Sequence, residues 1–136
     1  MVEYKIVLSD PKTGKSKQIE AKDAMVKSLH GKRIGDKIAG ELIDMPGFEF
    51  EITGGSSNAG FPMRRDIEGV RKVKIYAVRG IGVRQGRRGQ KQRKTVFGNT
   101  VHEKTAQINM KVIKGTKPLV EEKKEEASKA EEKPAK

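Results

Sequence analysis

Apolar and polar residues alternate over several short stretches of this chain, and turn-forming residues separate these stretches. Residues 2–8 place Val2, Tyr4, Ile6 and Leu8 at every second position. A period of two predicts a β-strand with one buried face, because successive side chains of a strand point to opposite sides. By the same pattern we predict strands over residues 2–8, 17–21, 48–53, 70–78, 95–101 and 105–113.

Helical patterns are short by comparison. Residues 24–29 predict one or two turns of helix. Residues 35–39 predict a second short helix, because the side-chain oxygen of Asp36 can accept a hydrogen bond from a first-turn amide. Turns at 10–14 and 45–47 and a glycine-rich loop at 54–63 join the strands. This arrangement is typical of a mainly β protein, a small closed or partly closed β-barrel with one or two short helices.

The last part of the chain has a different composition. From residue 119 to 136 it consists mostly of Glu, Lys and Ala and has no apolar stripe that could pack on a core. Such a segment is predicted to be a disordered tail of mixed charge. Residues 1–118 are therefore expected to form one domain, with a small core because the chain has only six aromatic residues.

Positive charge is concentrated in one part of the sequence. Residues 64–94 contain twelve Lys and Arg residues and two acids, a net charge of +10, whereas residues 1–63 contain nine bases and nine acids. Arginine outnumbers lysine eight to four in the basic segment. Arginine binds phosphate through a planar, bidentate guanidinium group, so the segment predicts a polyanionic partner and specifically a nucleic acid.

Residues 79–94, RGIGVRQGRRGQKQRK, form the centre of this segment, which we call the basic arm. It has four glycines and seven bases but only Ile81 and Val83 as apolar residues, so it is predicted to be a long loop between two strands. The sequence shows no basic helix with a zipper, zinc finger or helix-turn-helix pattern, which favours structured RNA over DNA. The candidate RNA-binding residues are Arg64, Arg65, Arg71, Lys72, Lys74, Arg79, Arg84, Arg87, Arg88, Lys91, Arg93 and Lys94.

Other motifs give weaker evidence of a function. Residues 13–16, TGKS, resemble the end of a phosphate-binding P-loop but lack its first glycine and lie in a predicted hairpin turn. The glycines of the basic arm miss the spacing of a dinucleotide fingerprint. His102 and Glu103 are adjacent, and adjacent residues of an extended chain point to opposite faces, so they are poorly placed for acid–base catalysis. We expect no enzymatic activity and no small-molecule substrate.

Composition also argues against metal sites, cofactors and membrane spans. The chain has no cysteine and only two histidines, His30 and His102, far apart in sequence. We therefore expect no metal site and no cofactor. No stretch approaches the roughly 20 apolar residues of a membrane span, and the first ten residues lack the apolar region of a signal peptide, so we expect a soluble intracellular protein without a membrane partner.

Several motifs around the basic arm occur together. They are Gly54-Gly55, Gly60-Phe61-Pro62-Met63, Arg93-Lys94-Thr95-Val96, Gly98-Asn99-Thr100 and Gln107-Ile108-Asn109. In this order they resemble the small-subunit ribosomal protein S6e family of archaea and eukaryotes, and the length resembles the archaeal members. The resemblance covers roughly residues 1–115.

The resemblance implies a six-stranded barrel that binds small-subunit ribosomal RNA, contacts neighbouring ribosomal proteins, and has no enzymatic activity. It implies a cytoplasmic location in the small ribosomal subunit, and we expect a monomer when the protein is free. The alternative is a nucleic-acid-binding module that acts outside the ribosome, such as an RNA chaperone or a chromatin-like protein.

Overall fold

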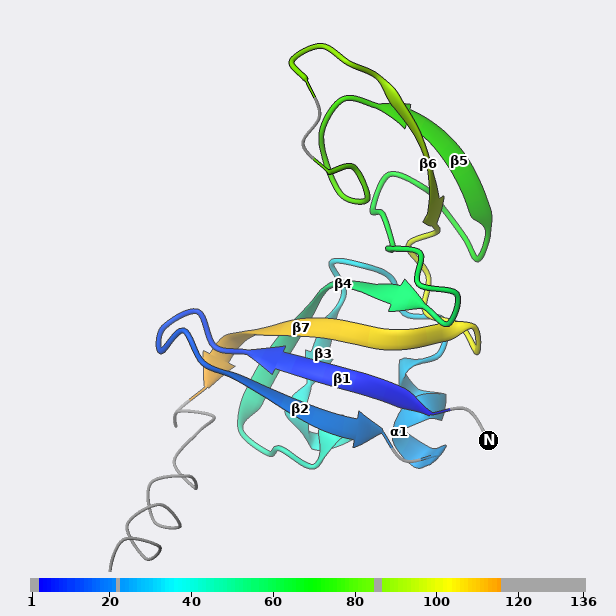
Figure 1. Cartoon of the computed structure of the whole chain (residues 1–136). Coiled ribbons are helices and arrows are strands. Elements are labelled where there is room, and N and C mark those ends of the chain that lie inside the picture. The colour runs from blue at the N-terminus through cyan, green and yellow to red at the C-terminus, as the bar shows by residue number, and fades with distance from the viewer. Residues whose placement is uncertain (1–2, 22, 85–86, 116–136) are drawn as a thin grey trace, which may run out of the picture.

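The computed structural model describes residues 3–21, 23–84 and 87–115. Seven strands, one α-helix and one 3₁₀ helix follow one another in these segments (Figure 1). Their bounds are β1 (Tyr4–Ser9), β2 (Ser16–Ala21), α1 (Asp23–Leu29), β3 (Lys37–Ala39), η1 (Gly40–Ile43), β4 (Phe48–Ser57), β5 (Lys72–Ala77), β6 (Gln92–Phe97) and β7 (Thr105–Gly115).

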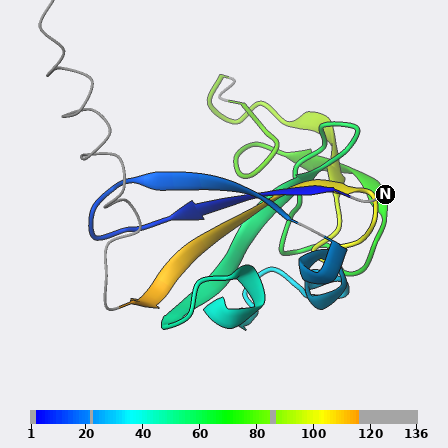
Figure 2. The same ribbon diagram turned by 90° about the horizontal axis from the view of Figure 1, so that it is seen from below.

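Five of the strands form one sheet in the order β2-β1-β7-β4-β3. All neighbours are antiparallel except β1 and β7, which run parallel with Ile6 opposite Ile108. The alternating apolar residues of β1, β4 and β7 point to the same face of this sheet. There they form the core with α1 and η1, which lie on one side of the sheet in Figure 2. The central core residues are Tyr4, Ile6, Leu8, Leu29, Ile43, Phe50, Ile52, Ile108 and Met110.

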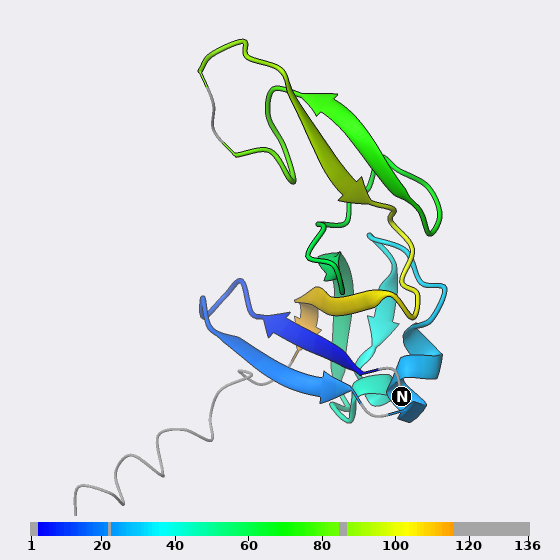
Figure 3. The same cartoon turned by 45° about the vertical axis from the view of Figure 1, so that its right-hand side comes forward.

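The remaining strands, β5 and β6, pair only with each other and form a separate hairpin. Figure 3 shows this hairpin projecting from one end of the five-stranded sheet. The prediction of a six-stranded barrel is therefore wrong. The edge strands β2 and β3 do not pair with each other, and β5 and β6 form a sheet of their own, so the five-stranded sheet stays open.

Predictions of single strands and helices were more accurate than the prediction that the sheet closes into a barrel. The hairpin of β1 and β2, helix α1 and the alternation in β5 are confirmed. The short helix predicted at 35–39 is instead the edge strand β3. The Asp36 carboxylate accepts a hydrogen bond from the Arg33 amide, 2.8 Å away, and so closes a turn before β3. Ile38 is buried opposite Phe50, so burial on the sheet overrides the cap signal.

Three boundaries also differ from the predictions. Strand β4 continues through Ser57, into the segment predicted as a glycine-rich loop, because residues 54–57 pair with β7. Strand β6 begins at Gln92, so the last residues of the basic arm belong to a strand. The segments 95–101 and 105–113, expected as a pair, have different partners, since β6 pairs with β5 and β7 pairs with β1 and β4.

Two predictions concern parts of the chain that are only partly described. The domain end predicted at residue 118 and the tail at 119–136 lie outside the described residues. Within the part that is described, no helix has the length and apolar character needed to cross a membrane.

Candidate nucleic-acid interface

The pairing of β5 with β6 sorts the side chains of the hairpin onto two faces. Lys74 lies opposite Thr95, and Tyr76 lies opposite Arg93, so these four residues share one face. Lys72 continues this face toward the sheet, and its ammonium group lies 4.8 Å from the centre of the Phe61 ring, a cation–π contact. Lys72, Lys74, Tyr76 and Arg93 are all exposed. We call them the basic strand face.

The opposite face of the hairpin carries Val73, Ile75 and Val96, with the exposed Lys94 opposite Ile75, and is partly covered by the chain itself. After β5 the arm folds back, so that Gly82 lies against this face. A methyl group on Gly82 would be 3.0 Å from side-chain carbons of Pro62 and Val96. Glycine also permits the φ of +86° found there. The first part of the basic arm is the predicted loop, and it folds back so that Gly82 contacts the hairpin.

Arg64 holds this returning segment in place. Its side chain is only 16% exposed. Its Nη2 donates to the Asp66 carboxylate at 2.6 Å, and its Nη1 donates to the carbonyl oxygen of Ile81 at 3.2 Å. Arg64 is therefore engaged within the protein, and it differs in this respect from the other candidate residues.

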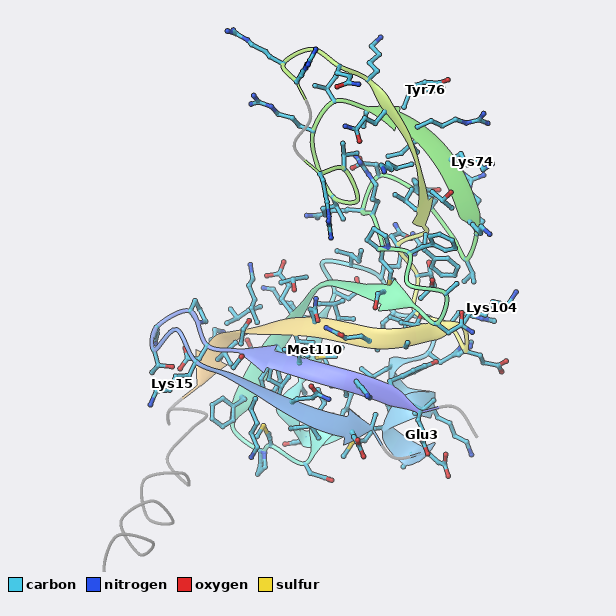
Figure 4. All side chains as sticks on the ribbon, in the orientation of Figure 1. Glu3, Lys15, Lys74, Tyr76, Lys104 and Met110 are labelled. Atoms are coloured by element: carbon cyan, nitrogen blue, oxygen red, sulfur yellow. The ribbon has the colours of Figure 1, made fainter. Side chains whose placement is uncertain are left out.

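The other eleven candidate residues are exposed. In the segments that the structure describes, Arg64 alone among the twelve forms an ion pair, whereas Lys111 and Lys114 of the sheet pair with Glu51 and Glu49. Figure 4 shows long side chains with nitrogen tips radiating from the hairpin, with Lys74 and Tyr76 pointing outward from β5. The hairpin thus carries a high density of unneutralised positive charge, which attracts a polyanion.

Residues 62–71 and 97–101, which we call the neck, join the hairpin to the sheet. Asn99 is 8% exposed and lies at the centre of the neck. Its Oδ1 accepts a hydrogen bond from the Gly69 amide at 3.3 Å, and its Nδ2 donates to the carbonyl of Arg65 at 3.4 Å. Its backbone amide donates to the carbonyl of Ile67, 2.8 Å away. One buried side chain therefore fixes the loop that precedes β5.

Glycines allow the close packing of the neck. A methyl group on Gly98 would lie 1.8 Å from the carbonyl oxygen of Gly69. One on Gly55 would lie 2.3 Å from the carbonyl oxygen of Gln107. The Gly55 carbonyl also accepts a hydrogen bond from the Met63 amide at 2.9 Å. At these two positions any side chain would force backbone segments apart.

Comparison with known proteins agrees with the motifs that build the neck. A profile of the ribosomal protein S6e family matches residues 4–124. The chain belongs to the ribosomal protein S6e family. Among its relatives, the small ribosomal subunit protein eS6 of Methanocaldococcus jannaschii is 43% identical over 118 residues, 86% of this chain and 88% of that protein. The protein of the same name from Nanoarchaeum equitans is 45% identical over 118 residues, 86% of each chain. That of Archaeoglobus fulgidus is 40% identical over 122 residues.

Membership of the S6e family, a family of structural rather than enzymatic proteins, confirms the resemblance seen in the sequence. The structure explains why its motifs occur together. Gly55, Met63, Gly98 and Asn99 are distant in sequence but meet at the neck. These four residues help to position the hairpin, whereas Arg93 and Lys94 of the same set of motifs contribute to its charge.

Two of the motifs that resembled enzyme sites, residues 13–16 and the pair His102 and Glu103, lie outside the hairpin of β5 and β6. Residues 13–16 lie in and just after the turn between β1 and β2, where the Asp10 carboxylate accepts hydrogen bonds from the Lys12 amide and the Thr13 hydroxyl. The first of these bonds is the main cause of the lowered pKa of Asp10. His102 packs against His30 with ring centres 5.2 Å apart. No cluster of metal-ligating side chains occurs among the residues described.

Sequence reasoning missed the significance of Tyr76. It is 72% exposed, whereas the other five aromatic residues are buried or half-buried. The signal was present in the alternation of β5, which put Tyr76 on the same face as Lys72 and Lys74. Its cross-strand neighbour Arg93 could not be found without the register of β6.

Proposed function

We propose that this chain is a structural protein of the small ribosomal subunit in the cytoplasm, and that its basic hairpin binds ribosomal RNA. The ribosomal role comes with the family, whose members bear the name small ribosomal subunit protein eS6. The RNA-binding surface is the more specific part of the proposal. It consists of the basic strand face and the exposed cations of the arm and neck.

The observation that carries the proposal is the density of unpaired positive charge on a projecting hairpin. Eleven exposed Lys and Arg residues lie within residues 65–94, where Asp66 is already engaged by Arg64. Such a concentration of like charge is unfavourable until counterions or phosphates neutralise it. Release of those counterions on RNA binding then supplies a large part of the affinity.

Arg64 is better understood as a brace than as a phosphate ligand. Its guanidinium already interacts with Asp66 and with the carbonyl of Ile81. We therefore assign RNA contact to the other eleven residues and assign Arg64 to holding the arm against the neck. The neck in turn fixes the direction in which the hairpin presents its cations to RNA and to neighbouring ribosomal proteins.

The salt dependence of RNA binding tests the proposal. With about six to eight phosphate contacts, log affinity should fall with log salt at a slope of roughly −4 to −7. Replacing Arg84, Arg87, Arg88 and Arg93 together with Gln should weaken binding and make the slope shallower by roughly 3 to 4. A matched control replaces Lys5, Lys12, Lys15 and Lys17, all exposed on the β1–β2 hairpin, with Gln. Equal affinities of the two variants would refute the proposed surface.

Sedimentation distinguishes the ribosomal role from that of a free nucleic-acid-binding module. A structural ribosomal protein should co-migrate with the small subunit after a high-salt wash of a cell extract. A free RNA chaperone or chromatin-like protein should be released by the same wash, because its binding depends almost wholly on counterion release.

A further inference from the structure

Tyr76 is the most exposed large apolar side chain of the described residues, at 72%. It contributes little to the fold, because its ring faces away from the apolar side of the hairpin, where Val73 and Ile75 lie. A single exposed aromatic residue is common on protein surfaces and needs no function by itself. The surroundings of Tyr76 are what give it a specific meaning.

Positively charged groups surround the Tyr76 ring on the same face. Arg93 lies directly opposite on β6, where paired side chains have Cβ atoms roughly 5 Å apart. Lys74 lies two residues earlier on β5, about 7 Å away along the strand. Both side chains are exposed, and both are long enough to reach past the ring. The ring is thus a flat apolar surface between two cations.

Aromatic rings beside cations are the usual means by which proteins hold unpaired nucleotides. The base stacks on the ring, and the cations contact the phosphates on either side. A base within a duplex has both faces covered by its neighbours, so only an unpaired base can use such a surface. Phe61 already has Lys72 over its ring, and Phe97, opposite Lys72 on β6, is buried, so Tyr76 is the ring that remains open.

We propose that Tyr76 is a stacking site for an unpaired nucleobase of the bound RNA, with Arg93 and Lys74 holding the adjacent phosphates. This proposal rests on the proposed function and adds a preference to it. The hairpin selects RNA with a bulged or looped-out nucleotide over a continuous duplex. The basic arm supplies affinity without regard to sequence, whereas Tyr76 selects for local RNA structure.

The test uses the full-length protein and two RNA hairpins of the same stem, one with a single bulged 2-aminopurine and one without the bulge. Binding of the wild-type protein should quench the 2-aminopurine fluorescence and should favour the bulged RNA. Tyr76→Leu should abolish the quenching and lower affinity for the bulged RNA roughly 5- to 150-fold, since stacking contributes about 1–3 kcal/mol per base. Tyr76→Phe, which retains the ring, should behave like wild type.

Two further measurements separate stacking from other effects. Tyr76→Leu should leave the salt slope unchanged because it removes no charge, whereas Arg93→Gln should make it shallower by about 1. Ile81→Ala is the matched control, since Ile81 is an apolar residue of the arm that is 52% exposed. It should retain both the quenching and the preference for the bulge.

The outcomes are distinguishable. If wild-type protein binds with a steep salt slope but Tyr76→Leu binds the bulged RNA equally well, the stacking site is refuted and RNA binding by the hairpin stands. That result would assign the exposed ring to a neighbouring protein or to no partner. If the wild-type protein binds neither RNA, the proposed function itself fails.

Discussion

Replacing Gly98 with alanine tests whether the neck fixes the hairpin to the sheet. The added methyl group would lie 1.8 Å from the carbonyl oxygen of Gly69 and 2.8 Å from its carbonyl carbon. Both groups belong to backbone, which cannot turn aside as a side chain can. The loop at Gly69 would have to retreat by about 1.6 Å to reach the shortest ordinary contact distance of 3.4 Å.

Hydrogen bonds of the neck would be lost in that movement. Those at risk are the bond from the Gly98 amide to the Arg71 carbonyl at 2.9 Å, the bond from the Asn99 amide to Ile67 at 2.8 Å, and the bond from the Gly69 amide to Asn99 Oδ1 at 3.3 Å. At about 1 kcal/mol each, their loss costs about 3 kcal/mol. Alanine also restricts the conformations of the unfolded chain, which stabilises the folded state by about 0.5–1 kcal/mol. We therefore expect Gly98→Ala to lower the free energy of unfolding by about 2–2.5 kcal/mol.

Urea denaturation followed by circular dichroism would measure this change, and thermal denaturation should show a Tm lowered by roughly 8–20 °C. Gly54→Ala is the matched control, because a methyl group there would meet no atom within 4 Å. It should change the free energy of unfolding by no more than about 0.5 kcal/mol. A Gly98→Ala protein as stable as the Gly54→Ala protein would show that the neck does not need a glycine, and the reasoning would be wrong.

Three other predictions follow from single side chains. Arg64→Gln should leave the salt slope of RNA binding unchanged, because Asp66 already neutralises the guanidinium. It should also lower the free energy of unfolding, measured by urea denaturation, by about 1 kcal/mol. A salt slope shallower by one unit would contradict the assignment of Arg64 as a brace. Hydrogen bonds, above all from the Lys12 amide, lower the pKa of Asp10 below its usual 3.8. The Asp10 carboxylate therefore stabilises the fold above pH 3.8, and this stabilisation is lost as the pH falls through the lowered pKa. An NMR titration of the Asp10 carboxyl measures the pKa, and a value at or above 3.8 would refute the prediction. Burial, and then the charge of Glu103, raise the pKa of Tyr4 above 10.0, so stability should fall as the pH rises above that value. Tyr4→Phe should remove this fall in an alkaline denaturation series and should not destabilise the protein at neutral pH, because the buried hydroxyl has no hydrogen-bond partner among the described residues.

The sequence predicted those parts of the fold that depend on local pattern. The strand at 70–78 and its two faces follow directly from alternation, because Val73 and Ile75 are apolar while Lys72 and Lys74 are charged. The barrel could not be judged in the same way. Whether a strand joins the main sheet depends on pairing between residues far apart in sequence, and alternation does not specify the partner. In the structure β5 and β6 pair with each other, and the five-stranded sheet is open.

The candidate site was predictable in composition but not in arrangement. The twelve candidate residues were selected from charge alone, and their contact with RNA stays a prediction. Charge could not distinguish Arg64 from the rest. Its role depends on Ile81, which comes near only because the arm folds back over the hairpin. Ile38 shows the same limitation for the fold. Its local signals favoured a helix, and its contact with Phe50 on the sheet decided otherwise.

The parallel pairing of β1 with β7 determines the order in which this protein can fold. The hydroxyl of Ser9 donates to the carbonyl of Met110, 101 positions away along the chain, so the central sheet cannot be completed before Met110 has been synthesised. Strands β5 and β6 pair across the loop between them and are much closer in sequence than β1 and β7. Contacts between residues close in sequence form quickly. The basic hairpin can therefore form while the sheet that will support it still lacks its middle strand.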